Sequence, residues 1–516
     1  MRGVIIAAWG CLLVLLALSP LAQATLLENI PLDSWVYQAM DELHCQGFFP
    51  SLHTEVKPYT RGEIAALILD INQGKNGGNA RLTISQLWLL NKLNQEFRYE
   101  LERLLGRREE GAASVNVLRY GISPVGHLVA AEGDSSYGRL QARFEAGIQF
   151  GDKLVVKDRV VVDTKAEKER SYWGREWKGD LTGVLDQAYA NIDLKYLRLL
   201  LGRDHLRWGP GGEDVLLLSG QIPPFDMVKA EARFGSFKFV YFTTVLDQIR
   251  DEERSFDAKR YLAGHRLNMK LKFGVQMGIS EVVLYGGENR NPEPYYLNPL
   301  LPFYGEQYGN DKDDNVLWSF DIALSTFRNK EIYFELLVDD FQYDFKSEPQ
   351  QTGFRLGLNW AQPLGWERSY ARLEYAKINN FVYGQVQPWN VYTYHGWGMG
   401  SMLGPDADRW FFRLLYHFTK DMDLSVSGQV TRKGEGRIEA FAVPAVPYPD
   451  KFPSGVVEHS NQYRFGFVYQ PGARLRLDLS AGYIRIRNFE NQKGRKDDTL
   501  LFRAQLSLNL WKERKL

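Results

Sequence analysis

Most of the chain after residue 115 alternates apolar and polar residues with a period of two. In the segment 474–483, one face carries Leu475, Leu477, Leu479, Ala481 and Tyr483, and the other carries Arg476, Asp478, Ser480 and Gly482. The segments 500–510 and 463–469 repeat the pattern. A period of two is that of a β-strand. A soluble sandwich would bury these charges at a cost, whereas strands between lipid and a wet lumen would not.

Candidate strands between residues 115 and 511 number about 16 to 18, and single-chain bacterial barrels have an even number of strands. The sequence therefore predicts an all-β transmembrane barrel of about 16–18 antiparallel strands over 115–511. Tryptophans near strand ends, such as Trp360, Trp410 and Trp511, are typical of interfacial girdles. A barrel this wide needs filling, and the long loops 286–315, 381–408 and 432–459 could supply it.

The segment 25–110 has helical spacing instead. Trp35, Ala39 and Leu43 recur on one face, and Thr60 and Glu63 have the spacing of a capping box before an apolar run. A second amphipathic helix is predicted over 84–105. We expect a small α-helical periplasmic domain over 25–110, as a bundle or a plug below the barrel.

The first 24 residues read as a signal peptide. Arg2 supplies the positive end, 4–18 the apolar stretch and Ala22-Gln23-Ala24 the small-residue cleavage site. After residue 24 no apolar run reaches the ~20 residues that a membrane-spanning helix needs. The exported chain would then be soluble or enter a membrane as a barrel, and the strand pattern favours a barrel in the outer membrane.

The composition of the chain argues against several classes of function. Lys+Arg 63 and Asp+Glu 63 balance, so nothing favours nucleic acid. One of the two cysteines lies in the predicted leader, which excludes a disulfide framework in the mature chain. The eight histidines show no metal-ligand spacing, so no metal or cofactor is expected. Glu458-His459-Ser460 is the only tempting catalytic cluster, but neighbours on a strand point to opposite faces. We therefore expect no enzymatic activity and no catalytic residues.

In the segment 196–226, a Gly/Pro-rich turn separates two apolar runs. Gly209, Pro210 and Gly211 can fix its backbone. Such a turn can hold Asp204, His205, Arg207 and Trp208 in one defined place, either as a structural turn at the barrel mouth or lumen wall, which is the favoured reading, or as a direct ligand contact.

Three stretches together resemble the capsule assembly Wzi family of outer-membrane barrels. They are GRDHLRWGPGGEDVLLLSGQIPPF at 202–225, YLNPLLPF at 296–303 and YHGWGMGSMLGPDADR at 394–409. The resemblance spans roughly 115–511. It implies an outer-membrane barrel closed by loops and a periplasmic helical part, acting as a surface lectin that holds capsular or exopolysaccharide.

The segment 27–72 resembles a single S-layer homology repeat. The matching residues are Trp35, Tyr37, Leu43, Gly47 and the Thr-Arg-x-Glu at 60–63. The resemblance implies binding of peptidoglycan or another cell-wall polymer. The alternative is a small helical cap.

Polysaccharide binding needs aromatic faces for sugar rings and planar polar groups for hydroxyls and carboxylates. The candidates are Asp204, His205, Arg207, Trp208, Tyr296, Tyr304, Trp389, Tyr394, His395, Trp397, Asp406 and Arg409. For any one of them the alternative is a girdle or loop-packing role. The expected function is non-catalytic retention of surface polysaccharide, with outer-membrane lipid as the second partner. The rival function is a wall-tethered porin or channel for small solutes.

Overall fold

The computed structural model describes residues 26–74, 82–110, 116–131, 136–168, 172, 174, 176–178, 181–309, 313–340, 349–441 and 451–515. The predicted signal peptide, residues 1–24, lies outside the described residues. No helix in these ranges is long and apolar enough to cross a membrane.

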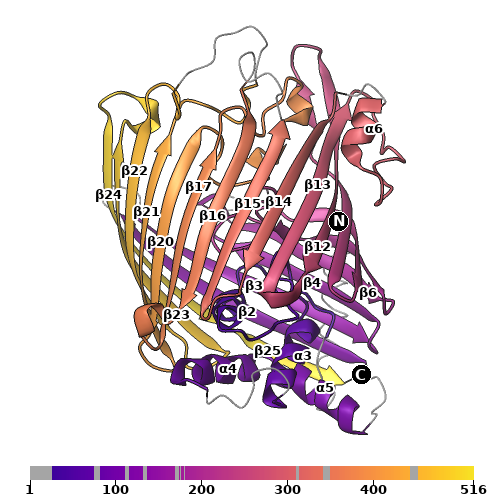
Figure 1. Ribbon diagram of the computed structural model, residues 1–516, viewed down its shortest axis with the longest axis vertical. Helices are drawn as coiled ribbons and strands as arrows, with labels where there is room; N and C mark the ends of the chain where they lie inside the picture. Colours follow the sequence, from indigo (N-terminus) through magenta and orange to yellow (C-terminus); the bar gives the residue numbers. More distant parts are fainter. Residues whose placement is uncertain are drawn as a thin grey trace.

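Eighteen antiparallel strands close into a barrel within the described residues (Figure 1). In barrel order they are β2 (Val117–Ala131), β3 (Tyr137–Phe150), β4 (Leu154–Asp163), β6 (Leu181–Asp193), β7 (Leu197–Asp204), β9 (Phe225–Phe234), β10 (Phe237–Val245), β12 (Phe256–Lys270), β13 (Val275–Gly287), β14 (Asn315–Leu324), β15 (Lys330–Asp340), β16 (Gln351–Ala361), β17 (Ser369–Ile378), β20 (Ala407–His417), β21 (Met422–Lys433), β22 (Glu458–Tyr469), β23 (Leu475–Arg487) and β24 (Lys496–Leu508). The last strand continues as β25 (Leu510–Lys515), and both pair with β2. Two short strands, β5 (Glu176–Lys178) and β11 (Ile249–Asp251), extend hairpins. The predicted barrel is confirmed.

The apolar face of each strand points outward, as the alternation predicts. Leu128, Leu140 and Leu201 are each about two-thirds exposed, which suits contact with lipid. Trp410 is also exposed on the outer face. The prediction that Trp511 belongs to an interfacial girdle is wrong. Its ring points into the lumen, where the Arg119 guanidinium lies 4.7 Å from the ring centre. The exposed Leu510 faces outward, so the period of two turns the next residue inward.

The two ends of the barrel differ. Turns of a few residues, such as 151–153 and 418–421, join strands at one end, and segments as long as 379–406 join them at the other. Helices α3 (Arg61–Asn72), α4 (Ile84–Glu96) and α5 (Arg98–Glu110) lie at the short-turn end, and α6 (Phe303–Gly309) lies at the long-loop end (Figure 1). Because outer-membrane barrels have short periplasmic turns, we assign the short-turn end to the periplasm.

The N-terminal helices differ in two details from the sequence prediction. The predicted 84–105 helix is interrupted at Phe97, whose buried ring supports the Arg61 guanidinium at 4.7 Å. The capping box predicted at 60–63 is half formed, because Thr60 accepts from the Glu63 backbone N–H while the Glu63 carboxylate pairs with Arg233 of β9. A complete capping box starts α4, between Thr83 and Gln86.

Helix α2 (Val36–Cys45) reaches into the barrel rather than staying below it (Figure 1). Cys45 packs in a buried cluster with Ala361, Tyr370 and Leu415 of three barrel strands. His44 lies 3.3 Å from the Glu331 carboxylate on the inner wall. Residues 26–57, here called the plug, therefore enter the lumen from the periplasmic end, while α3 to α5 stay at that end.

Candidate functional site

Residues 205–224, here called the lumen loop, leave the wall where β7 ends and turn into the barrel. Within this loop β8 (Arg207–Trp208) pairs with β1 (Val56–Lys57) of the plug. Gly211 has a φ of 78°, and a Cβ there would lie 2.7 Å from Arg355 and Tyr333. A side chain at this position would thus be both strained and too close to the wall, which explains the glycine in the turn.

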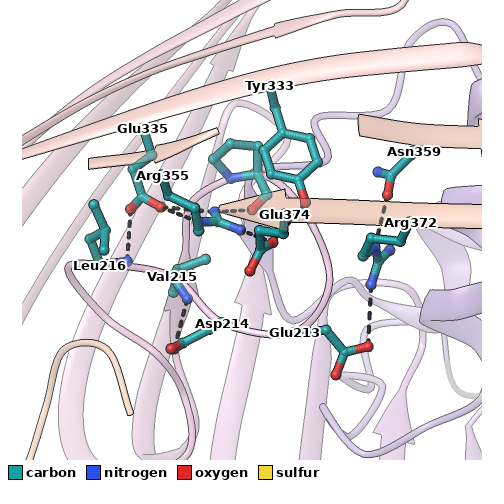
Figure 2. Close-up of polar contacts among 12 residues, drawn as sticks. Glu213, Asp214, Val215, Leu216, Tyr333, Glu335, Arg355, Asn359, Arg372 and Glu374 are labelled. Carbon is teal, nitrogen blue, oxygen red and sulfur yellow. Dashed lines mark hydrogen bonds and ion pairs between the residues drawn. The ribbon is translucent and has the colours of Figure 1, made fainter. Parts of the chain in front are cut away.

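Strand-borne charges hold the backbone of the lumen loop (Figure 2). Arg355 is fully buried and donates to Glu335 at 2.8 Å, to Glu374 at 2.9 Å and to the carbonyl of Pro210. Glu335 in turn accepts from the Leu216 backbone N–H at 3.0 Å. Buried charges are costly unless paired and hydrogen-bonded, and here the loop backbone supplies part of the pairing.

The plug segment ahead of α2 is fixed by the opposite wall. Glu28 accepts from Arg119 at 3.3 Å and pairs with Lys157. Burial alone would raise the pKa of Glu28, but these two cations outweigh it and hold the pKa well below its usual range. Asn29 donates to Asp204 at 2.7 Å. Asp204, the last residue of β7 before the lumen loop, therefore ties the plug to the wall.

Residues 379–406, here called the mouth loop, cross the extracellular end and are tied to the lumen loop. Tyr392 donates to the Leu217 carbonyl at 3.1 Å, and the Ser401 hydroxyl donates to Asp214 at 2.6 Å. Arg260 of β12 donates to the carbonyls of Trp389, Val391 and Thr393, each at 2.8 Å. The loop is thus anchored at both its wall side and its lumen side.

The filling of the lumen is asymmetric. Inward residues of β14, β15, β16 and β17 are all buried. Inward residues of β21 to β24 are half-buried or exposed, apart from Ser460 and Ser507. A polar cavity of about 1280 Å³ follows the β2–β4 and β23–β24 wall. Its lining includes Arg474 at the periplasmic end and Asp163 at the extracellular end, so it extends beside the plug along the barrel.

His205 lies in this cavity, 3.1 Å from the Asp186 carboxylate. Burial would lower the pKa of His205, but the hydrogen bond and charge of Asp186 outweigh it and raise the pKa. Asp186 is directed inward by a bulge in β6, where the register against β4 shifts. The imidazole therefore links the lumen loop to the barrel wall.

The rest of the 204–208 cluster is buried. Asp204 accepts from Asn29 and, at 2.7 Å, from Gln187. Arg207 donates to the carbonyls of Gly211 and Asp214 within its own loop. Trp208 is fully buried, edge-on to Phe242 with ring centres 5.3 Å apart. The cluster lies inside the barrel and contacts the plug. This placement fits the interpretation of the cluster as a structural turn at the lumen wall.

Four further candidates brace loops or the wall. Tyr296 is fully buried and donates to Asp314 at 2.8 Å, and Tyr394 packs 5.3 Å from the Phe225 ring. Asp406 accepts from the Ser454 hydroxyl at 2.5 Å and from the Gly436 N–H at 3.0 Å. Arg409 lies inside the wall, 3.4 Å from Glu374.

The remaining candidates are at the extracellular end. Tyr304 on α6 is 56% exposed. Trp389, His395 and Trp397, all half-buried, share the mouth loop. Trp389 lies 5.5 Å from Phe256 and beneath Arg254 at 5.4 Å. His395 donates its backbone N–H to Asp247, which also pairs with Arg260. The structure therefore leaves the Trp389, His395 and Trp397 side chains partly open to solvent on one loop.

Sequence reasoning missed the charged network that holds the lumen loop. Its members are Glu213, Asp214, Glu335, Arg355, Arg372 and Glu374. The available signal was charged residues among the alternating positions of β15 to β17, namely Glu331, Glu335, Asp339, Arg355, Arg372 and Glu374. Within the described residues, no group of three or more His, Cys, Asp or Glu is placed to hold a metal ion.

Solved structures of other proteins resemble this chain. The chain is similar to the solved structure of Wzi, an outer membrane protein involved in group 1 capsule assembly in Escherichia coli and described as a carbohydrate-binding β-barrel, with 15% identity, a TM-score of 0.64, and coverage of 93% of this chain and 99% of that chain. Pseudomonas aeruginosa OccD3 matches with 7% identity, a TM-score of 0.48, and coverage of 77% of this chain and 92% of that chain. No curated protein sequence matches the chain.

The model of one protein family, the capsule assembly protein Wzi, matches residues 127–500. The match takes in β3 to β23 together with the lumen loop and the mouth loop, which is well over half of the chain. The chain therefore belongs to the capsule assembly protein Wzi family of outer-membrane barrels.

Proposed function

We propose that this barrel binds capsular or exopolysaccharide at its extracellular mouth and retains it on the cell, without catalysis. One observation carries the proposal: the mouth loop crosses the lumen and is anchored to the lumen loop, while Trp389, His395 and Trp397 remain partly open to solvent. Family membership and the E. coli relative, described as carbohydrate-binding, support it.

The surface around Trp389 has the chemistry that acidic sugars need. The Arg254 side chain is 48% exposed. Besides lying over the Trp389 ring, it donates to Asp251 at 2.8 Å and to Gln387 at 3.0 Å. A sugar ring would stack on the indole, and a uronate carboxylate would meet the Arg254 fork. Because the Trp389 carbonyl is fixed by Arg260, little conformational freedom would be lost on binding.

A deletion strain complemented with variants tests the proposal. Trp389→Ala should lower the amount of cell-bound polysaccharide and raise the amount shed to the medium. Trp366→Ala is the matched control, because Trp366 is 63% exposed but follows β16 at the periplasmic turns. Undiminished retention in the deletion strain itself would contradict the proposal.

The cavity beside the plug favours a second candidate function, a passage for small solutes. Its lining comes from both ends of the barrel, including Arg474 and Asp163. A large steady current in planar bilayers would support a channel. Polysaccharide retention requires no such current. Measuring both the conductance and the cell-bound polysaccharide therefore distinguishes the two functions.

Binding of a cell-wall polymer by residues 27–72 stays a prediction. Two of the repeat-like residues are engaged within the protein: Tyr37 donates to the Ile30 carbonyl at 2.7 Å, and Arg61 pairs with Glu96 at 2.9 Å. Co-sedimentation of the purified protein with peptidoglycan measures this binding. Protein that stays in the supernatant would contradict it.

A further inference from the structure

The outward faces of β22, β23 and β24 form rows that are ordered by depth. The strand register places Phe465, Ala481 and Phe502 in one row. One step toward the extracellular end lies a row of Tyr463, Tyr483 and Leu500, and the next two rows are Asn461, Arg485, Asp498 and His459, Arg487, Lys496. The sequence of apolar, aromatic and charged rows matches hydrocarbon, interface and head-group depths in a membrane.

The apolar rows contain a groove of about 400 Å³ on the lipid-facing side. Its outward-facing lining is entirely apolar: Leu128, Ala130, Phe465, Phe467, Leu479, Ala481, Phe502 and Ala504. Ala481 and Ala504 are short, and the longer phenylalanines stand on either side. The groove therefore offers a hollow that hydrocarbon can fill.

Cations exceed anions directly above this groove. Arg487 is bonded to Asp498 at 2.6 and 3.1 Å. The side chains of Arg485 and Lys496 make no hydrogen bond or ion pair with any other residue that the structure describes, although Arg485 lies opposite Asp498 and interacts with its charge. Two positive groups therefore remain available at head-group depth on the same three strands.

We propose that this face binds an anionic glycolipid of the outer leaflet, with an acyl chain in the groove and phosphate groups at Arg485 and Lys496. Arginine and lysine are suited to phosphate, arginine through its planar fork. A second copy of the chain fits less well, because a two-fold contact would set each cationic rim against itself. This inference is independent of polysaccharide binding.

The test uses the whole purified protein, stripped of co-purified lipid in detergent. Native mass spectrometry then compares two probes, diphosphoryl lipid A and its dephosphorylated form. The diphosphoryl form should bind more tightly, and Arg485→Ala with Lys496→Ala should weaken its binding by about tenfold or more while sparing the dephosphorylated form. Ala481→Phe should fill the groove and weaken both probes.

Two controls are matched in chemistry and lie elsewhere on the barrel. Lys259→Ala removes an outward cation on β12, and Ala190→Phe enlarges an outward alanine on β6. Neither should change the preference for the phosphorylated probe. Heat-modifiable gel migration shows that each variant still forms its barrel.

Three outcomes would overturn the proposal: equal binding of the two probes, unchanged binding in the Arg485→Ala, Lys496→Ala variant, or a groove that proves to be covered by a second copy. The last would appear as a dimer that Ala481→Phe dissociates without any effect of lipid.

Discussion

Tyr383 of the mouth loop donates its hydroxyl hydrogen bond to the Leu216 carbonyl at 2.6 Å, and the same hydroxyl accepts from the Ser401 backbone N–H at 3.2 Å. Both side chains, Tyr383 and Leu216, are buried. One phenol thus joins the loop across the mouth to the loop inside the lumen. The position of the mouth loop therefore depends on the lumen loop beneath it.

Tyr383→Phe should loosen both loops without unfolding the barrel. The substitution leaves a buried carbonyl and a buried N–H without their partner, at a cost of about 1–3 kcal/mol. We expect faster hydrogen exchange in 205–224 and 379–406 and unchanged exchange in β14 to β17. Tyr308→Phe is the control, since Tyr308 is 83% exposed on α6. Equal exchange in the two variants would mean that the phenol does not couple the loops.

Arg355→Met should lower the stability of the filled lumen. It leaves Glu335 and Glu374 buried without their shared cation, and breaking a buried pair from one side costs about 3–5 kcal/mol. The temperature at which the folded band shifts on a semi-denaturing gel should fall. Adding Glu335→Gln and Glu374→Gln should recover part of the loss, because the uncompensated charges are then gone. No recovery would point to lost packing rather than charge.

Alternation along the strands was enough to predict the barrel. Segment 474–483 became β23, and 500–510 became the end of β24 and the start of β25. Each strand carries that signal locally, because lipid and the lumen select different residues at successive positions. The ion pairs of the lumen carry no local signal: Arg355 meets Glu335 and Glu374 only through the register of three strands.

The course of 205–224 could not be read from its residues. The run 215–218 is apolar, like a strand, yet it lies inside the lumen with all four side chains at 0–1% exposure. An apolar run indicates burial but does not say what buries it. For the same reason, the sequence could not distinguish buried binding candidates from exposed ones. Trp208 is buried and Trp389 is half-buried, but the two look alike in sequence.

Acid should detach α3 from the barrel before the barrel itself opens. Glu63 lies 2.9 Å from Arg233. Burial alone would raise the pKa of Glu63, but Arg233 and Lys238 outweigh it and lower the pKa to about 2. A carboxyl with a depressed pKa stabilises docking above its ordinary pKa of 4.5, and this contribution is lost as pH falls toward 2. Hydrogen exchange in α3 should rise over that window.

Glu63→Gln is the matched control for this titration. It removes the charge at every pH, so exchange in α3 should be faster at neutral pH and should lose its dependence on pH between 4.5 and 2. If the variant and the parent chain titrate alike, another group governs docking of the helix.

Trp397→Ala should weaken polysaccharide retention without unfolding the barrel. Trp397 is half-buried, so part of its ring faces solvent, and its backbone pairs with Tyr394 across the short strands β18 (Thr393–Tyr394) and β19 (Trp397–Gly398). Cell-bound polysaccharide should fall while heat-modifiable migration is kept. Unchanged retention would remove Trp397 from the binding surface and leave Trp389 as its main aromatic group.

Arg260→Lys tests whether polysaccharide retention depends on the position of the mouth loop when the loop's own side chains are unchanged. Arg260 spreads its donors over three carbonyls of the loop and lies 3.3 Å from Asp247. A lysine keeps the charge but cannot reproduce the planar fork. We expect retention to fall with Trp389 and Trp397 intact, together with faster hydrogen exchange in 389–395. Lys259→Arg is the control, since residue 259 neighbours Arg260 but faces outward. Full retention with a mobile loop would show that polysaccharide binding does not depend on how the mouth is held.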